Sequence, residues 1–329
     1  MDGAPEVEQH RPPATVSPAR VYTGTSRWAR TAAMGGWGAA LVLWSLTLGV
    51  PNDTIGIFLW LWLATVAWHV QAPPRHHLGF LRDWWAPMVG LVIYFLSRGL
   101  ADEFGRTAAF QMPIDVDRWL GFGHLPTEVL QQALCEMPCR ATDPRWYDLL
   151  LTTVYSTHFG LGLTLAAVLW MVNRAEWKRW MRRYLAINFA GLAIYILYPM
   201  APPWMAAQHG LINPQIERLT GRGWADIGLE RVNMILDGVG NPVAAMPSLH
   251  TGISVLVALY GISRLRSAWR WLLLLYPALM CVALVYYAEH YVIDLVAGAA
   301  LAIAVMWGCA VWERSRDVAP DRTGQVSSN

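Results

Sequence analysis

The sequence predicts an all-α fold, a polytopic membrane helix bundle with about eight transmembrane helices. Two observations carry this prediction. Hydrophobic residues make up 55% of the 329 residues and charged residues only 15%, a balance well above the apolar content of soluble domains. Long runs almost without charge also recur along the chain, and helices satisfy their own backbone hydrogen bonds inside a bilayer. The net charge of +2 gives no basic domain that would bind nucleic acid.

The candidate transmembrane segments are the nearly uncharged runs that are long enough to cross a bilayer. A helix of about 20 residues crosses a hydrocarbon core of about 30 Å, and Pro or Gly within such a helix is tolerated better in lipid than in water. Arg98 lies near one end of the third segment. The eight segments are 32–50, 54–73, 84–101, 147–172, 184–204, 247–263, 271–288 and 291–312.

The Lys and Arg residues between these segments predict the orientation. With a cytoplasmic N-terminus, 17 of them lie inside and seven lie outside, and an excess of cations marks the cytoplasmic side. We therefore expect a multi-pass protein of the cell membrane with both termini in the cytoplasm. Two loops of about 45 residues, 102–146 and 205–246, then lie outside, and loops of that length usually serve a function.

The two ends of the chain have a different composition from the centre. Residues 1–28 are rich in Pro, polar and charged residues and lack the apolar stretch of a signal peptide. Residues 316–329 are similar. We expect two disordered cytoplasmic tails on either side of one membrane domain, residues 29–315.

The four cysteines indicate no structural zinc site, because no CxxC or Cys/His ligand spacing is present. Cys135 and Cys139 could form a disulfide in an oxidising compartment or remain two buried thiols. Cys281 and Cys309 lie inside predicted segments and are typical of small core residues.

A first candidate motif opens the sixth segment. Residues 245–252 read Ala-Met-Pro-Ser-Leu-His-Thr-Gly, with Ser248 at the start of an apolar run and His250 in its first turn. A Ser at a helix start, followed by unpaired backbone N–H groups, forms an anion-binding terminus.

A second motif opens the eighth segment. Residues 289–298 read Glu-His-Tyr-Val-Ile-Asp-Leu-Val-Ala-Gly. His290 and Asp294 are four residues apart and are expected on one helix face, where the carboxylate can bind one imidazole nitrogen and leave the other as a nucleophile. Both motifs start on the outer side, so we expect one extracytoplasmic site that contains both histidines.

The two motifs resemble signature blocks of the type 2 phosphatidic acid phosphatase superfamily, Pro-Ser-x-His and His-x-x-x-Asp. The sequence is most similar to a branch that includes inositol phosphorylceramide synthases and many actinobacterial membrane proteins, in which the last block reads His-Tyr-x-x-Asp. The resemblance covers roughly residues 90–300 and implies a six-helix phosphatase-like core. It also includes Tyr198 to Trp204, Asp117 to Gly123 with Pro126, and His158-Phe159.

The superfamily's usual phosphate-binding cations are missing. Its first block, a Lys followed by Arg-Pro, has no counterpart, and Leu284 stands where an Arg is expected before the nucleophile. Arg98 is the leading substitute, because a guanidinium binds phosphate in two-point fashion; a salt bridge to Asp102 is the alternative. His158 could bind phosphate or orient another side chain. Weaker candidates are Arg145 and Arg231, and Glu289 could be only a helix N-terminal charge.

The resemblance implies a lipid phosphotransferase that acts through a phosphohistidine on His290, with Asp294 as its orienting carboxylate and His250 as acid and base. A phospho-headgroup would pass to a lipid alcohol, with Ser248, Arg98 and His158 as candidate phosphate-binding residues. The alternative is a lipid phosphate phosphatase that uses the same triad. Neither scheme needs a metal or a cofactor, and the expected partners are a lipid substrate and the membrane.

Three other classes of protein remain open from the sequence. Two His and one carboxylate could hold a non-haem iron in an oxygenase, although a Pro-Ser helix start has no purpose there. A transporter would place its ionisable groups near the bilayer midplane and often contain a repeat. A catalytically inactive scaffold would not need an intact triad. The lipid, the acceptor and the oligomeric state do not follow from the sequence.

Overall fold

The computed structural model describes residues 24–49, 51, 54–100, 107–224 and 243–317. These residues form helices joined by turns, and no strand is found among them, only isolated bridges that link Met200 to Ala109 and Ala244. The all-α prediction is confirmed. The long helices are α1 (Arg27–Leu48), α2 (Thr54–Trp68), α3 (Pro74–Leu100), α6 (Trp146–Val172), α7 (Arg174–Leu197), α10 (Leu249–Arg264), α11 (Leu275–Tyr286) and α12 (Val292–Asp317).

Each of the eight predicted segments overlaps one of these helices, the seventh α11 and the 3-10 helix η3 (Ala268–Leu274) before it, although α3 and α7 begin ten residues earlier than predicted. In the described part of the chain, four helical stretches are long and apolar enough to cross a membrane: Arg27–Leu48, Trp146–Val172, Ala268–Tyr286 and Val292–Arg316. The other long helices do not meet these conditions of length and apolar composition. The apolar part of α2 and the whole of α10 have fewer than 18 residues, and the first ten residues of α7 include six charged residues.

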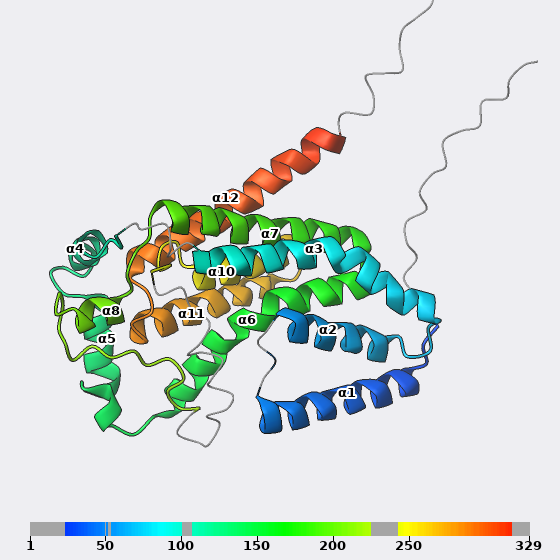
Figure 1. Cartoon of the computed structure of the whole chain (residues 1–329), viewed down its shortest axis with the longest axis horizontal. Coiled ribbons are helices and arrows are strands. Elements are labelled where there is room, and N and C mark those ends of the chain that lie inside the picture. The colour runs from blue at the N-terminus through cyan, green and yellow to red at the C-terminus, as the bar shows by residue number, and fades with distance from the viewer. Residues whose placement is uncertain (1–23, 50, 52–53, 101–106, 225–242, 318–329) are drawn as a thin grey trace, which may run out of the picture.

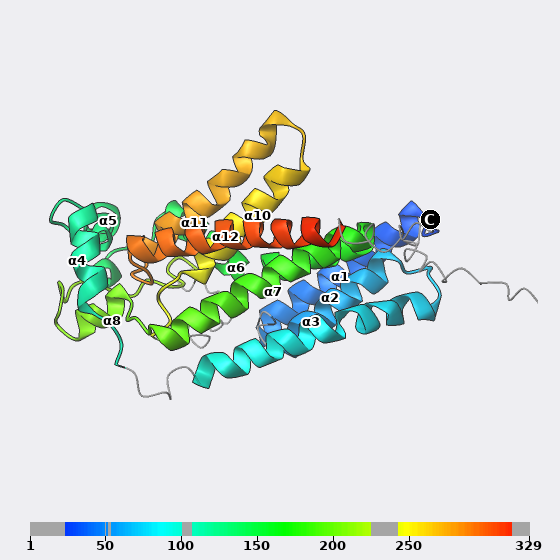
Figure 2. The same cartoon turned by 90° about the horizontal axis from the view of Figure 1, so that it is seen from above.

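The first outer loop was expected as a long connection and is largely helical. It contains α4 (Gln111–Leu120), α5 (Pro126–Cys135) and the short 3-10 helix η1 (Cys139–Ala141), and α8 (Pro203–Gln208) opens the second loop. Pro126 at the start of α5 suits the first turn of a helix, where its missing N–H is not needed. Figures 1 and 2 show α4, α5 and α8 together at one end of the bundle, away from the C-terminal end of α12.

Large aromatic side chains fill the main core between α2, α3, α6 and α7. Trp84, Trp170 and Trp180 are each at most 1% exposed, and the indole N–H of Trp180 donates to the Gly162 carbonyl oxygen at 2.9 Å. An indole buried in this way needs such a partner. Gly162 also lies close to Tyr184, since a Cβ at position 162 would be 2.4 Å from the Tyr184 ring.

The ends of the membrane domain are described in part. α1 begins at Arg27 with Ser26 as its N-cap, and α12 continues to Asp317. The tails predicted from the sequence otherwise lie outside the described residues, so their disorder stays a prediction.

Candidate active site

The start of α10 brings the first motif into position. Ser248 is the N-cap, fully buried, and its Oγ accepts a hydrogen bond from the Thr251 N–H at 3.3 Å. His250 lies in the first turn of the helix, as the sequence predicts. Capping by Ser leaves other backbone N–H groups of this turn directed out of the helix end.

The second motif places a histidine beside a buried carboxylate. His290 Nδ1 lies 3.3 Å from Asp294 Oδ2, and the same oxygen accepts the Tyr291 N–H at 2.9 Å. Asp294 is fully buried and His290 is 6% exposed. The expected contact is therefore present, but the expectation that both residues lie on one helix face is wrong. α12 begins at Val292, and His290 precedes it in the turn after α11.

Two glycines allow α10 and α12 to approach closely beside these residues. A Cβ on Gly298 of α12 would lie 2.2 Å from the Ser248 carbonyl oxygen, and a Cβ on Gly252 would lie 3.2 Å from the Gly298 carbonyl oxygen. The Ser248 N–H also donates to the Asp294 backbone oxygen at 3.0 Å. Backbone contact between the two helices thus fixes the two motifs relative to each other.

Aromatic rings surround His250 and connect it to His290. The His250 and His290 ring centroids are 5.7 Å apart. On another side of His250 lies the ring of His158 from α6, at 4.0 Å, and the ring of Tyr155 stacks on His250 at 4.8 Å. The structure therefore places the His158 ring in contact with His250, one of the candidate catalytic residues.

Asp117 of α4 holds the start of α12. Its carboxylate is fully buried and accepts the backbone N–H groups of Val292 at 2.8 Å and Ile293 at 3.1 Å. A carboxylate at this position accepts hydrogen bonds from the otherwise unpaired N–H groups of the first turn and interacts favourably with the positive end of the helix dipole. Burial raises the pKa of Asp117 above its ordinary value, while the two hydrogen bonds act in the opposite direction.

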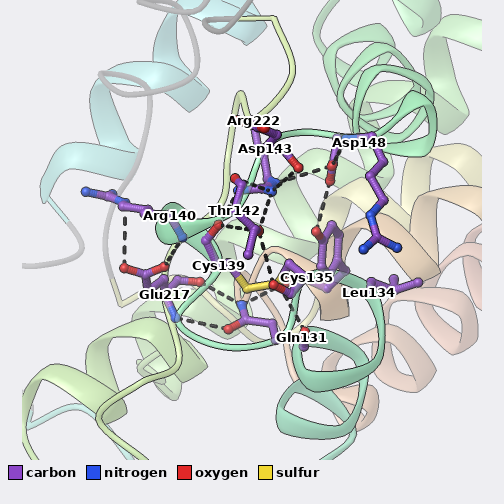
Figure 3. Close-up of a disulfide and its surroundings, with 12 residues drawn as sticks. Gln131, Leu134, Cys135, Cys139, Arg140, Thr142, Asp143, Asp148, Glu217 and Arg222 are labelled. Carbon is purple, nitrogen blue, oxygen red and sulfur yellow. Dashed lines mark hydrogen bonds and ion pairs between the residues drawn. A yellow bond between two sulfur atoms is a disulfide. The ribbon is translucent and has the colours of Figure 1, made fainter.

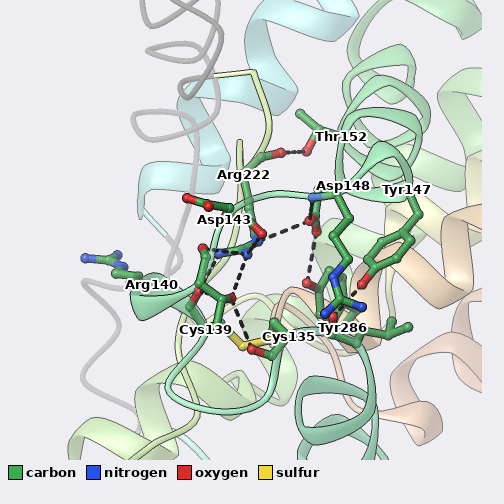
Figure 4. Close-up of polar contacts among 12 residues, drawn as sticks. Cys135, Cys139, Arg140, Asp143, Tyr147, Asp148, Thr152, Arg222 and Tyr286 are labelled. Carbon is green, nitrogen blue, oxygen red and sulfur yellow. Dashed lines mark hydrogen bonds and ion pairs between the residues drawn. A yellow bond between two sulfur atoms is a disulfide. The ribbon is translucent and has the colours of Figure 1, made fainter.

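A polar cluster ties the two outer loops to the bundle next to this site. Arg222 lies 3.3 Å from Asp148 of α6 through its Nε, and its Nη2 donates to the Thr142 carbonyl oxygen at 3.0 Å. Asp148 also accepts a hydrogen bond from the Tyr286 hydroxyl at 2.9 Å. Figure 4 shows Arg222 between the first loop and the start of α6. Asp148 is 1% exposed, so loss of either charged partner would leave an unpaired buried charge.

Cys135 and Cys139 form a disulfide within the first outer loop. Figure 3 shows it between Gln131 and Thr142. The amide of Gln131 donates to the backbone oxygen atoms of Glu217 at 2.7 Å and Tyr286 at 2.9 Å. The first loop is therefore bound both to the second loop and to the end of α11. The sequence left open whether Cys135 and Cys139 form a disulfide or remain two thiols, and the structure contains the disulfide.

The remaining candidate residues have different outcomes. Arg98 lies in the last turn of α3, but its side chain and Asp102 are outside the described residues, as is Arg231. Arg145 is the N-cap of α6 and lies 3.7 Å from Glu136. Glu289 is more than a helix N-terminal charge, because its Oε1 accepts hydrogen bonds from Arg218 Nε at 2.6 Å and Thr220 Oγ1 at 2.8 Å.

Sequence reasoning missed the contacts that arise between distant segments. Tyr155 was not singled out, although it lies three residues before His158, about one helical turn away on the same helix. Asp117 was part of the family resemblance but had no role assigned. Arg218 was not singled out either, and it pairs at 2.6 Å with Glu289, the residue before His290.

The fold and site together define a membrane-embedded helix bundle with a His, His and Asp cluster at one end. The sequence profile of the PAP2 superfamily matches residues 114–308, more than half of the chain. The chain belongs to the PAP2 superfamily, which confirms the resemblance seen in the motifs.

Curated relatives match a shorter part. The catalytic subunit aur1 of inositol phosphorylceramide synthase from Schizosaccharomyces pombe is 31% identical over 156 residues, 45% of this chain and 35% of the relative. Phosphoinositol dihydroceramide synthase from Bacteroides thetaiotaomicron is 28% identical over 139 residues, 40% of this chain and 45% of the relative. Inositol phosphorylceramide synthase from Candida albicans is 27% identical over 158 residues, 45% of this chain and 32% of the relative.

The chain spans less than half the length of these relatives. No solved structure matches the chain. The three relatives are named as synthases of inositol phosphorylceramide or of phosphoinositol dihydroceramide.

Proposed function

We propose that this protein is an integral-membrane lipid phosphotransferase that moves a phospho-headgroup to a lipid alcohol through a phosphohistidine intermediate on His290. The observation that carries the proposal is the pairing of His290 with buried Asp294 at 3.3 Å, with the His250 ring 5.7 Å from the His290 ring. One phosphate can contact both imidazoles at that separation.

The first step forms the intermediate. His290 Nδ1–H donates to Asp294, so Nε2 keeps its lone pair and attacks the phosphorus of a phospholipid. The new P–N bond replaces the bond from phosphorus to the lipid alcohol oxygen. Protonated His250 gives its proton to that oxygen, and a diacylglycerol-type alcohol leaves. Asp294 stabilises the positive charge on the substituted imidazole.

The second step completes the transfer. Neutral His250 now accepts the proton of the acceptor hydroxyl, and the acceptor oxygen attacks phosphorus. The P–N bond breaks, its electron pair returns to His290 Nε2, and the new phosphodiester leaves. With water as the acceptor, the same steps would constitute hydrolysis.

Charge on the phosphoryl oxygens would be met by the N-terminus of α10 at Ser248, by Arg98 from α3 and by His158. The absence of an Arg at Leu284 supports a substrate with one negative charge. A phosphodiester meets that condition, whereas a terminal phosphate carries up to two. The relatives are named as synthases of products with an inositol phosphate headgroup on a ceramide, which agrees with transfer to a lipid alcohol.

The proposal places the site on the extracytoplasmic face of the cell membrane. The 17 to 7 distribution of cations supports this orientation. The disulfide gives independent support, because disulfides persist in oxidising compartments and this one lies in a loop bound to the site end of the bundle.

The test supplies both kinds of substrate to the purified full-length protein in detergent. One arm contains a phospholipid with a phosphodiester headgroup and either diacylglycerol or ceramide, and the other contains phosphatidic acid. We expect the new phospholipid to form faster than inorganic phosphate is released, and His290→Ala to stop both. Rapid phosphate release, with no transfer product for any alcohol, would assign the protein as a lipid phosphate phosphatase.

A further inference from the structure

A polar cavity lies at the opposite end of the bundle from the histidines. It has a volume of about 340 Å³ and lies between α7, α10 and α12, and its polar lining includes Arg179, Arg183, Tyr260, Arg264, Glu313 and Arg314. α10 extends from Leu249 to Arg264, so at 1.5 Å per residue this cavity is about 20 Å from His250. It is therefore distinct from the proposed catalytic site.

One wall of the cavity is built by a buried ion pair. Arg183 is 3% exposed, and its Nη1 and Nη2 donate to the two carboxylate oxygens of Glu313 at 2.7 and 2.9 Å. Arg182 also contacts Glu313. This two-point pairing fixes the Arg183 guanidinium plane and joins α7 to α12 beside the cavity.

Behind the lining residues, a second glutamate is shared between several donors. Glu176 Oε1 lies 2.8 Å from Arg179, and Oε2 lies 2.9 Å from Arg264 and 2.6 Å from the Tyr260 hydroxyl. Arg179 and Arg264 are each 42% exposed at the side chain. Their remaining N–H groups are therefore accessible to a ligand in the cavity.

Positive charge exceeds negative charge around the cavity. Five arginines but only two glutamates make up the cluster, with Arg182 and Glu176 behind the lining residues. The Arg314 side chain has no hydrogen bond or ion pair with any residue in the described ranges. Ser263 adds a hydroxyl, while Met306 and Ala310 make the α12 wall apolar.

We propose that this cavity binds the phosphate of an anionic phospholipid, with the acyl chains along α12. Guanidinium groups match phosphate oxygens in two-point geometry, and basic pockets between transmembrane helices suit anionic headgroups. A lipid fits better than a free ion, because Ile303, Trp307 and Val311, on the same helix as the lining residues Met306 and Ala310, expose 57%, 68% and 40% of their surface. This proposal does not depend on the chemistry at His290.

The test measures lipid binding to the full-length protein by native mass spectrometry in a neutral detergent. The probes are dioctanoyl phosphatidylglycerol, dioctanoyl phosphatidylcholine and inorganic phosphate. The cavity variant is R264Q with R314Q. The matched control is R266Q with R316Q, which removes the same charge at the same end of the bundle from residues that do not line the cavity. Thermal unfolding is recorded for both variants.

We expect the cavity variant to bind phosphatidylglycerol at least about tenfold more weakly, equivalent to ~1.4 kcal/mol, and the control to bind within twofold of wild type. S263E adds a carboxylate without removing an ion pair and should weaken binding similarly. Equal losses in both double variants would show attraction to general surface charge and overturn the proposal. If wild type binds inorganic phosphate tightly and the cavity variant does not, the ligand is a free anion and the lipid assignment is overturned. If phosphatidylcholine binds as tightly as phosphatidylglycerol, the requirement for a net negative charge is overturned.

Discussion

His290 and Asp294 have separable roles in the proposed reaction, and substitution can distinguish them. His290→Ala removes the atom that bonds to phosphorus, so turnover should fall to background. Asp294→Asn keeps a group of the same size but no longer favours the required tautomer, and a loss on the order of 10³- to 10⁴-fold is expected. Initial rates of lipid product formation measure both effects.

His209→Ala is a suitable control for these variants, because His209 is exposed near the same end of the bundle and its ring contacts only that of Phe110 among the ring contacts described. It should retain wild-type turnover. Near wild-type activity of His290→Ala on the true substrate would contradict the phosphohistidine mechanism.

The sequence predicted site residues that lie within two short motifs. Ser248, His250, His290 and Asp294 stand in motifs that open the sixth and eighth predicted segments, and the predicted orientation places both openings on the same side. The sequence therefore predicted that the motifs meet, although it wrongly placed His290 on the same helix as Asp294. The position of Asp117 depends on contact between segments 175 residues apart. No local pattern encodes such a contact, which is why its role required the structure.

At the scale of helices, the crossing of α10 and α12 determines whether the two motifs meet. Gly298→Ala would place a methyl group 2.2 Å from the Ser248 carbonyl oxygen, so the helices must separate. We expect a lower unfolding temperature and a loss of activity of at least about tenfold, because small misplacements of catalytic groups are costly.

Gly308→Ala is the matched control on the same helix, since nothing lies within 4 Å of its Cβ position. Replacing an open helical Gly by Ala favours the helix by roughly 0.5 to 1 kcal/mol, so this variant should be unchanged or slightly more stable. Equal effects of the two substitutions on activity would show that the close crossing at Gly298 is unimportant.

Prediction of the helices from sequence succeeded where length and polarity constrain the chain. Uncharged runs located all eight long helices, because a bilayer requires an uninterrupted apolar segment. The loop helices α4 and α5 were missed, since they are short and their formation depends on packing against α11 and α12. The start of α12 at Val292 likewise depends on Asp117, a residue outside the local sequence.

For the whole molecule, the predicted orientation can be tested with single accessible cysteines. Cys281 and Cys309 would be replaced by Ser, and the Cys135–Cys139 disulfide retained because its sulfurs do not react with maleimides. Gln215 and Arg266 are exposed at opposite ends of the bundle. In intact cells, an impermeant maleimide should label Gln215→Cys and leave Arg266→Cys unlabelled.

Permeabilised cells provide the control, because both cysteines should then react. Labelling of Arg266→Cys alone in intact cells would place the histidines in the cytoplasm. The substrates available to the enzyme would then be those of the inner leaflet.

The hydrogen bonds from Val292 and Ile293 to Asp117 join the beginning of the family segment, residues 114–308, to its last helix. The first and the last parts of this segment are therefore in contact in the folded protein. The proposed reactive groups all come from the stretch 248–294, whereas Asp117, which holds the start of α12, and the rings of Tyr155 and His158 beside His250 come from α4 and α6 earlier in the chain. Because α1 precedes this segment in the chain, changes in α1 would leave the hydrogen bonds between α4 and α12 intact.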